Sequence, residues 1–271
     1  MLKRFFFRLL FLVIILFGSV YAYESYQASQ GTDSTMVVHT QKEQNIQFAE
    51  DGLTRTERLA RIFRTRSAVE EAMDKRVPKK ERVDEDSISI FMKEAMVATE
   101  DRRFYEHGAM DPRGSARATY TNLIHGETLE GGSTITQQLV KNLFLSSKRI
   151  MSRKVEEGAL AIQVEREYTK DQILTMYLNT IYFGNDYYGI KAAAKGYFHT
   201  TPGRLTLAQS AMLAGLPQAP TYFHPKANYK EATHQQVRVL KQMYEQGIIS
   251  GVQLKDAIDE DLGFAEDEKD M

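Results

Sequence analysis

The chain of 271 residues contains no cysteine. This absence excludes disulfide frameworks, zinc and iron–sulfur sites with cysteine ligands, and a thiol nucleophile. The six histidines show no metal-ligand spacing, and no serine has a lysine three residues later, so a Ser-x-x-Lys acyl-transfer nucleophile is also absent. Carboxylates and cations are left as the plausible catalytic groups.

The chain also lacks an excess of charge of either sign, because 35 basic residues face 36 acidic ones. This balance argues against a polyanion-binding surface over the whole chain. The charges are segregated, however. Residues 1–10 and residues 140–155 contain basic residues and no acid, whereas residues 255–271 contain eight acids and two lysines. Near-neutrality is therefore a cancellation between charged blocks.

Residues 1–23 are predicted to form a membrane anchor. Leu9–Tyr23 carries no charge, and with the preceding Phe5–Phe7 the apolar reach approaches the roughly 20 residues that span a bilayer. Lys3, Arg4 and Arg8 precede this run, which orients the N-terminus towards the cytoplasm. The alternative is a cleaved signal peptide ending at Val20-Tyr21-Ala22. Both interpretations place the rest of the chain outside the cytoplasm, and the first predicts a single-pass protein of the bacterial plasma membrane.

The remaining chain is predicted to contain a linker or stalk, one mainly α-helical domain and an acidic tail. Residues 24–82 are polar and include one charged helix at 53–76, a solvated stalk or packing arm. Residues 83–250 form the compact domain, and residues 251–271 are expected to be disordered. Three Thr-x-x-Gln capping boxes mark helix starts inside the domain, at Thr134, Thr169 and Thr206.

Glu100 is the first candidate catalytic residue, because it directly follows an apolar helix face that includes Ala95, Met96 and Ala98. A carboxyl held against apolar surface has a raised pKa, towards the range useful to a general base. The competing interpretation is an ordinary solvated helix end.

The segment 131–138 (GGSTITQQ) is a glycine-paired turn that opens a helix, and the N–H groups at such a start can bind an anion. It lacks the lysine of a nucleotide-binding phosphate loop, which makes nucleotide hydrolysis implausible. Alternatively, Thr134 and Gln137 only cap the helix.

A basic block follows this turn. Lys141 lies one helical turn after Gln137, and Arg149, Arg153 and Glu157 have the i, i+4, i+8 spacing that lines one helix face. Two guanidinium groups and a carboxylate on one face suit a pyrophosphate, with or without a divalent cation. An exposed, salt-bridged helix face is the alternative.

Together these segments resemble the peptidoglycan glycosyltransferases, the polymerase module of bifunctional penicillin-binding proteins and of monofunctional enzymes. The resemblance covers roughly residues 85–225. Its blocks, in order, are Glu100-Asp101-x-x-Phe104-x-x-His107, GGSTITQQLVKN at 131–142, Arg153-Lys154-x-x-Glu157, ILTMYLNTIYFG at 173–184, and GIKAAAKGYF at 189–198 with LAGLPQAP at 213–220.

The resemblance implies a lysozyme-like helical domain with a small membrane-proximal jaw lobe. It also implies polymerisation of lipid II into β-1,4-linked glycan strands, with inversion at MurNAc C1 and release of undecaprenyl pyrophosphate. A divalent cation, Mg²⁺ or Mn²⁺, is expected near Glu157, and no organic cofactor. The expected partners are lipid II, the growing lipid-linked glycan, the membrane and other cell-wall synthesis proteins, and no nucleic acid.

The family's site residues map onto this chain one by one. Glu100 matches the general base, and Glu157 the second glutamate, near the leaving pyrophosphate. The residues that match substrate-binding or supporting positions are Asp101, Phe104, His107, Arg117, Ser133, Gln137, Gln138, Lys141, Arg149, Arg153 and Lys154.

One departure concerns Ala109, which stands where the family usually has glycine; if that position requires a positive φ, alanine would be strained. Nothing beyond about residue 250 resembles a transpeptidase domain, so the chain is expected to be monofunctional or a fragment. Two other functions stay open, a lysozyme-like glycan-cleaving enzyme and a catalytically idle cell-wall scaffold. The unbalanced cations of the basic block argue against the first, and the intact Glu100 and Glu157 against the second.

Overall fold

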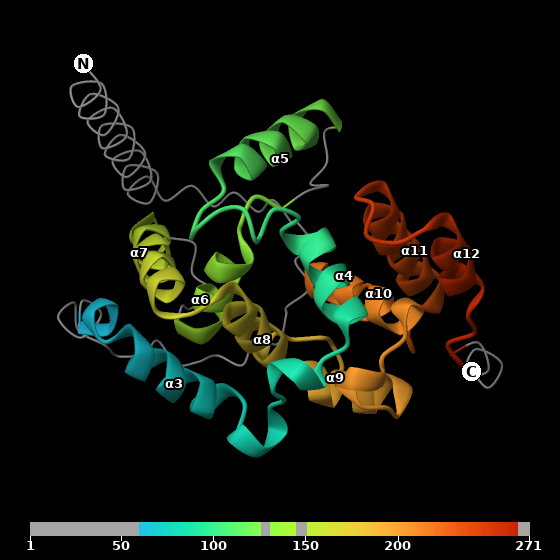
Figure 1. Ribbon diagram of the computed structural model, residues 1–271, viewed down its shortest axis with the longest axis horizontal. Coiled ribbons are helices and arrows are strands. Elements are labelled where there is room, and N and C mark those ends of the chain that lie inside the picture. The colour runs from blue at the N-terminus through green and yellow to red at the C-terminus, as the bar shows by residue number, and fades with distance from the viewer. Residues whose placement is uncertain (1–59, 126–130, 145–150, 265–271) are drawn as a thin grey trace, which may run out of the picture. The chain divides into compact units, whose positions relative to one another are not determined.

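The computed structural model of the chain describes residues 60–125, 131–144 and 151–264. The predicted anchor at 1–23, the linker up to residue 59, Arg149 and the last seven residues lie outside this range. Within it, apart from Met151, all residues belong to one compact unit. The described part is helical and contains no named strand, which confirms the mainly α class (Figure 1). No helix in this part has the length and apolar character to cross a membrane.

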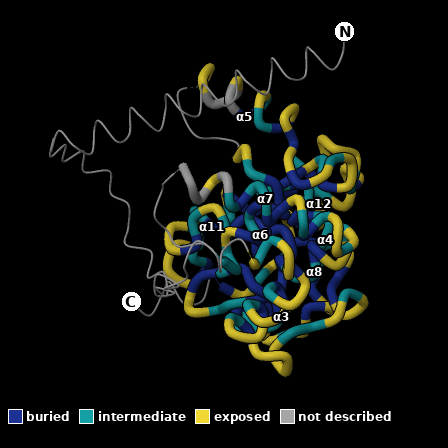
Figure 2. Tube along the Cα trace, turned by 90° about the vertical axis from the view of Figure 1, so that its left-hand side faces the viewer, coloured by how far each residue is buried: buried dark blue, intermediate teal, exposed yellow. Residues whose placement is uncertain are grey.

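The core of the unit is formed by two sets of packed helices. In the first set, α10 (Leu207–Gly215) packs against both α4 (Ile90–Glu100) and α11 (Tyr229–Glu245), and in the second α6 (Ile135–Phe144) packs on α8 (Lys170–Thr180). Figure 2 shows buried stretches of the trace around α4, α6 and α8. The apolar residues of 173–181 and 207–216 are buried, because each segment presents its side chains to a neighbouring helix.

Helix α7 (Met151–Glu167) contributes Leu160, Ala161 and Val164 to the same core. The chain continues from α8 through a tyrosine-rich turn into α9 (Ile190–Phe198) and the short η3 (Pro202–Arg204), and η4 (Leu216–Gln218) follows α10. Helix α5 (Pro112–His125) differs from the others, since its Tyr120, Leu123 and Ile124 are exposed to solvent.

All three predicted capping boxes are present. Thr169 and Thr206 each accept a hydrogen bond from the backbone N–H three residues later, and Gln172 and Gln209 return the contact to the threonine N–H. Thr134 and Gln137 make the same reciprocal pair, at 3.1 Å in both directions. Each box satisfies two N–H groups that a helix start leaves unpaired, which stabilises the helix by about 1 kcal/mol.

Helix α3 (Thr65–Arg76) belongs to the domain, so the boundary predicted at residue 83 is too late. It packs on α6 and α8, with Val69 and Met73 buried in the common core. Arg76 donates hydrogen bonds to the carbonyl oxygens of Thr180 and Asn142 at the ends of those helices. Of the two interpretations given for this helix, a solvated stalk or a packing arm, the described residues fit the packing arm. After it, η1 (Lys79–Glu81) and η2 (Glu85–Ser87) lead to α4.

The prediction of a disordered tail from residue 251 is wrong for its first part. Helix α12 (Gly251–Asp259) begins there, with Ser250 and Gln253 forming a fourth capping box. Ala257 and, after the helix, Phe264 are buried in the core, which supplies the packing that the acidic composition concealed.

Candidate active site

Glu100 is the last residue of α4 and lies at the edge of a pocket of about 230 Å³. Its Oε2 accepts a hydrogen bond of 2.8 Å from the Gln138 side-chain amide. Oε1 is covered from solvent and has no hydrogen-bond partner among the described residues, although the Gln218 amide is near enough to influence it. Burial raises the pKa of Glu100, the Gln138 and Gln218 amides oppose this, and the Asp101 charge adds to it. The carboxyl thus combines a raised pKa with an oxygen that makes no close hydrogen bond among the described residues.

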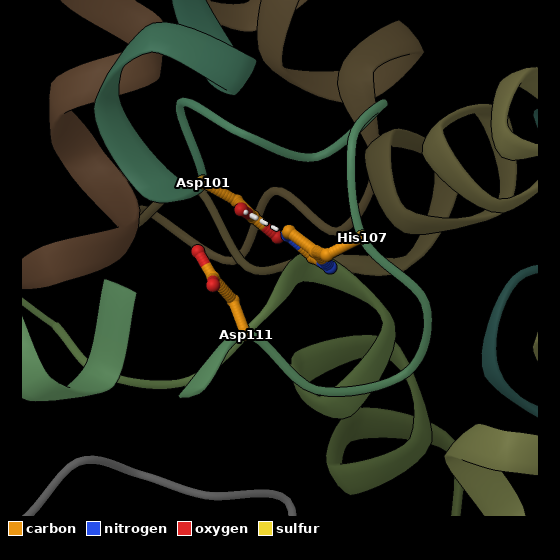
Figure 3. A group of neighbouring side chains, drawn as sticks. All are labelled: Asp101, His107 and Asp111. Atoms are coloured by element: carbon orange, nitrogen blue, oxygen red, sulfur yellow. Dashed lines mark hydrogen bonds and ion pairs between the residues drawn. The ribbon is translucent and has the colours of Figure 1, made fainter. Parts of the chain in front are cut away.

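Asp101 lines this pocket and lies beside His107 (Figure 3). Its Oδ2 accepts the Ile135 N–H at 3.1 Å, so a carboxylate lies at the N-terminus of α6, where the helix dipole stabilises negative charge. Its Oδ1 lies 2.8 Å from His107 Nε2, while His107 Nδ1 lies 2.6 Å from the Gly108 carbonyl oxygen. Both side chains are largely buried, so Asp101 and His107 hold the loop after α4 in place.

Asp111 completes the group drawn in Figure 3 and directly precedes α5. Arg103 Nη1 donates to its Oδ1 at 3.1 Å, and the Arg113 N–H donates to the same oxygen. Although burial raises the pKa of Asp111, the Gly114 N–H, Arg103 and His107 together lower it, so this carboxylate stays charged. Gly114 is required here, because any Cβ at that position would collide with the Asp111 carboxylate.

The turn 131–134 forms another wall of the pocket. Gly131, Gly132, Ser133 and Thr134 all line it, and Ser115 of α5 donates a hydrogen bond of 2.9 Å to the Gly132 carbonyl oxygen. Thr134 also donates to the carbonyl oxygen of Ala109. Ala109 does not have a positive φ, so the strain considered for an alanine at this position is absent.

Helix α11 supplies a wall that no sequence motif indicated. The residues of this helix and its end that line the pocket are Arg238, Gln242, Glu245 and Gln246. Gln246 donates to the Ala98 carbonyl oxygen at 3.0 Å, whereas Gln242 Oε1 is covered from solvent without a partner. Their i, i+4, i+7, i+8 spacing predicts one helix face, but not what that face meets.

Gln138 links Glu100 to a residue in the core. Its Oε1 accepts a hydrogen bond of 2.8 Å from the Tyr177 hydroxyl, and its amide N–H group donates to Glu100. Tyr177 lies on α8 and is fully buried. In the sequence, Tyr177 falls within the block 173–184 and has no role of its own there.

Glu157 has different surroundings. It lies on α7 and is 2% exposed, and Lys154, one turn earlier, pairs with its Oε1. Neither residue lines the pocket around Glu100, and nor does Lys141, an exposed residue of α6. Arg149 and the side chain of Arg153 lie outside what the structure describes, so the predicted cationic face stays a prediction.

Two of the predicted substrate-binding residues are engaged in supporting the fold. Phe104 is fully buried, with the Lys170 ammonium 4.4 Å from its ring centre, so its side chain supports the site from within the core. Gln137 is buried by its capping contact with Thr134. Asp101, Arg117 and Ser133 do line the pocket.

Comparison with known proteins identifies the part of the chain that contains the sequence motifs described above. The transglycosylase family profile matches residues 66–244. Penicillin-binding protein 1A/1B of Bacillus subtilis is 49% identical over 173 residues, 64% of this chain and 19% of its own length. Penicillin-binding protein 1A of Escherichia coli is 47% identical over 165 residues, 61% of this chain and 19% of its own length.

A solved structure, that of penicillin-binding protein 1A from Haemophilus influenzae, is 30% identical and covers 45% of this chain and 16% of its own, with a TM-score of 0.33. The chain thus spans about a fifth of the length of the curated relatives it matches.

Proposed function

The chain belongs to the transglycosylase family, the glycosyltransferases of peptidoglycan synthesis, and we propose that it polymerises lipid II into β-1,4-linked glycan strands. The observation that carries this proposal is the Glu100 carboxyl, which combines a raised pKa with a covered, unpartnered oxygen at the edge of a polar pocket. A general base needs both a high proton affinity and an oxygen free to accept the proton.

In the proposed reaction, Glu100 removes the proton from the 4-hydroxyl of the acceptor's GlcNAc. The resulting oxygen attacks C1 of the donor's MurNAc and forms the new glycosidic bond, while the bond from C1 to the pyrophosphate oxygen breaks. The bonding electron pair leaves with undecaprenyl pyrophosphate, and the proton stays on Glu100. Attack opposite the leaving group converts the α-linked donor into a β-linked product.

Negative charge accumulates on the pyrophosphate as this bond breaks. Cations that contact the pyrophosphate more strongly in the transition state than in the ground state accelerate the reaction. We assign this role to Lys141, Arg149 and Arg153, with Lys154 and Glu157 beside them. The pairing of Lys154 with Glu157 keeps an ammonium group on α7, nearly half exposed to solvent and able to meet an anion.

The described residues around Glu157 do not by themselves form a metal site. Glu157 offers one buried carboxylate, and Lys154 already occupies one of its oxygens. Asp101, His107 and Asp111 lie close together, but Asp101 is hydrogen-bonded to His107, and Asp111 to Arg103. A divalent cation, Mg²⁺ or Mn²⁺, therefore belongs to the proposal as a companion of the pyrophosphate, and none of the steps above depends on it.

The lipid tail of the proposed substrate suggests a function for the predicted membrane anchor. If residues 1–23 stay in the membrane, enzyme and substrate occupy the same leaflet, which raises their effective concentration. We further propose that α5 belongs to a membrane-proximal jaw lobe of a lysozyme-like domain, because Tyr120, Leu123 and Ile124 form an exposed apolar end. In this proposal the enzyme works at the extracytoplasmic face of the plasma membrane.

The test is the incubation of purified full-length protein with lipid II, with and without a chelator of divalent ions. Lipid-linked glycan polymer is the expected product, and the chelator is expected to slow its formation. A protein that shortens preformed glycan and leaves lipid II intact would instead be a glycan-cleaving enzyme. A protein that does neither would be a scaffold.

A further inference from the structure

A fully buried tyrosine hydroxyl lies two hydrogen bonds away from the Glu100 carboxyl. Tyr177 of α8 donates to Gln138 Oε1, and Gln138 Nε2 donates to Glu100 Oε2, each at 2.8 Å. Three helices that are distant in the sequence meet in this chain of contacts, since Tyr177, Gln138 and Glu100 belong to α8, α6 and α4.

The direction of these bonds is fixed by the chemistry of the two end groups. An ionised carboxylate can only accept hydrogen bonds, so the Gln138 side must present its N–H group to Glu100. The carbonyl oxygen of the same amide then faces Tyr177, where the phenol can donate to it. A flipped amide would set its oxygen against the carboxylate and leave the Tyr177 hydroxyl with no acceptor on Gln138.

Tyr177 is suited to hold this direction at every pH at which the enzyme works. Burial, followed by the negative charges of Glu100 and Asp101, raises the pKa of Tyr177 well above its ordinary value, so the phenol keeps its proton. The ring is fully buried and belongs to the core, which restricts the hydroxyl to one position.

We propose that Tyr177 is a positioning residue for the general base: its hydroxyl orients the Gln138 amide so that an N–H group always faces Glu100. The proposal rests on the assignment of Glu100 as base. By donating to the ionised form, the amide stabilises the carboxylate and limits the rise in its proton affinity that burial causes. Loss of this orientation leaves Glu100 buried without its donor, so it becomes protonated at a higher pH.

Other polar and charged groups near Glu100 also influence its pKa. The polar Gln218 amide from η4 opposes protonation, as Gln138 does. The charged side chains that line the same pocket are Asp101, Arg102 and Arg103 after α4, Asp111 and Arg117 at and in α5, and Arg238 and Glu245 in α11. None of them is altered by a change at Tyr177, so a shift in the titration of Glu100 would report on the amide.

The experiment compares Tyr177→Phe with wild type in the pH dependence of kcat/KM for lipid II. The base works in its deprotonated form, so the acid limb should move to higher pH, by about one unit for the loss of one hydrogen bond to a charged group. A merely structural role would lower activity at all pH values and leave the limb in place, and that outcome overturns the proposal.

Tyr197→Phe is the matched control. Tyr197 is also a buried tyrosine, and its hydroxyl donates to the Phe183 carbonyl oxygen at 3.0 Å. Its loss should destabilise the protein to a similar degree without moving the acid limb. A shift in this control as large as that in Tyr177→Phe would mean that the effect reports loss of stability, which contradicts the proposal.

A double-mutant cycle tests the route through Gln138. In a Gln138→Ala background, Tyr177→Phe should cause no further shift of the acid limb, whereas an independent, additive shift contradicts the proposal.

A titration of the ¹³C-labelled Glu100 carboxyl by NMR measures the same shift without turnover. If wild type forms no polymer, the proposed function fails, while the carboxyl titration still decides whether Tyr177 acts on Glu100. If Tyr177→Phe does not fold, Gln138→Ala alone must raise the pKa measured for the Glu100 carboxyl. An unchanged pKa in that variant refutes the proposal.

Discussion

The two glutamates of the proposed site are both sheltered from solvent, but their neighbours differ. Glu100 meets the neutral amides of Gln138 and Gln218 and keeps one oxygen without a partner, and its pKa is raised, chiefly by burial. Glu157 is paired with the ammonium group of Lys154. Amides leave a carboxylate able to accept a proton, whereas the Lys154 ammonium group already occupies one oxygen of Glu157. This difference is the reason we propose proton transfer for Glu100 and an electrostatic role for Glu157.

The largest expected effect is that of Glu100→Gln, which keeps the size of the side chain and removes the base. Polymerisation of lipid II should fall by about a thousandfold, within the range that general-base catalysis contributes, while donor binding changes little. Glu94→Gln is the control, because Glu94 lies on the same helix, also has a pKa raised by burial, and does not line the pocket. Wild-type-like turnover in Glu100→Gln would remove this residue as base.

Glu157→Gln should have a smaller effect on the rate, about tenfold to a hundredfold, since it removes a charge near the pyrophosphate and no proton acceptor. The acid limb of its pH profile should coincide with that of wild type. Steady-state kinetics over a range of pH values would measure both. If Glu157→Gln matched Glu100→Gln in size, or moved the acid limb, the division of roles between the two glutamates would fail.

Stability provides a third contrast. Lys154→Met should lower the free energy of unfolding by about 2 kcal/mol, because it leaves the Glu157 carboxylate, which is 3% exposed, without its cation. Lys75→Met removes the same type of residue from an ion pair with Glu71 in which both side chains are 68% exposed, and it should change stability little. Chemical denaturation at pH 7 would compare the two. Equal effects would show that Lys154 does not stabilise a buried charge.

The smallest effect is the contribution of Glu100 to the pH dependence of stability. Because its pKa is raised in the folded protein, the stabilisation associated with protonated Glu100 is complete below the pKa of the unfolded chain. That stabilisation is lost as the pH rises through the folded pKa, at about 1.4 kcal/mol for each unit of difference. Glu100→Gln should therefore gain stability relative to wild type as the pH rises above about 4.5, and a constant difference measured by thermal unfolding would argue against the raised pKa.

Local sequence signals predicted much of the fold and part of the site. The capping boxes at Thr134, Thr169 and Thr206 were predictable because each depends on two residues three positions apart. The fourth, at Ser250, carries the same signal but was concealed by the acidic composition around it. The helix end at Glu100 was likewise readable from the apolar residues before it.

Contacts between distant helices could not be predicted in this way. The bond from Tyr177 to Gln138 joins residues 39 positions apart, and it exists only because α6 and α8 pack at one particular register. The wall that α11 contributes through Arg238 and Gln242 depends in the same way on how α10 and α11 pack. Helix periodicity predicts that such residues share a face, and tertiary packing decides what the face contacts.

The central claim is that a buried carboxyl surrounded by amides accepts the proton in the glycosyl-transfer step. The measurement that tests it most directly is the pH dependence of kcat/KM for lipid II polymerisation by the full-length wild-type protein. An acid limb with a midpoint above the ordinary glutamate pKa of 4.5 is predicted, because Glu100 must be ionised to act and its pKa is raised. A profile that stays flat down to pH 4.5 would contradict the account.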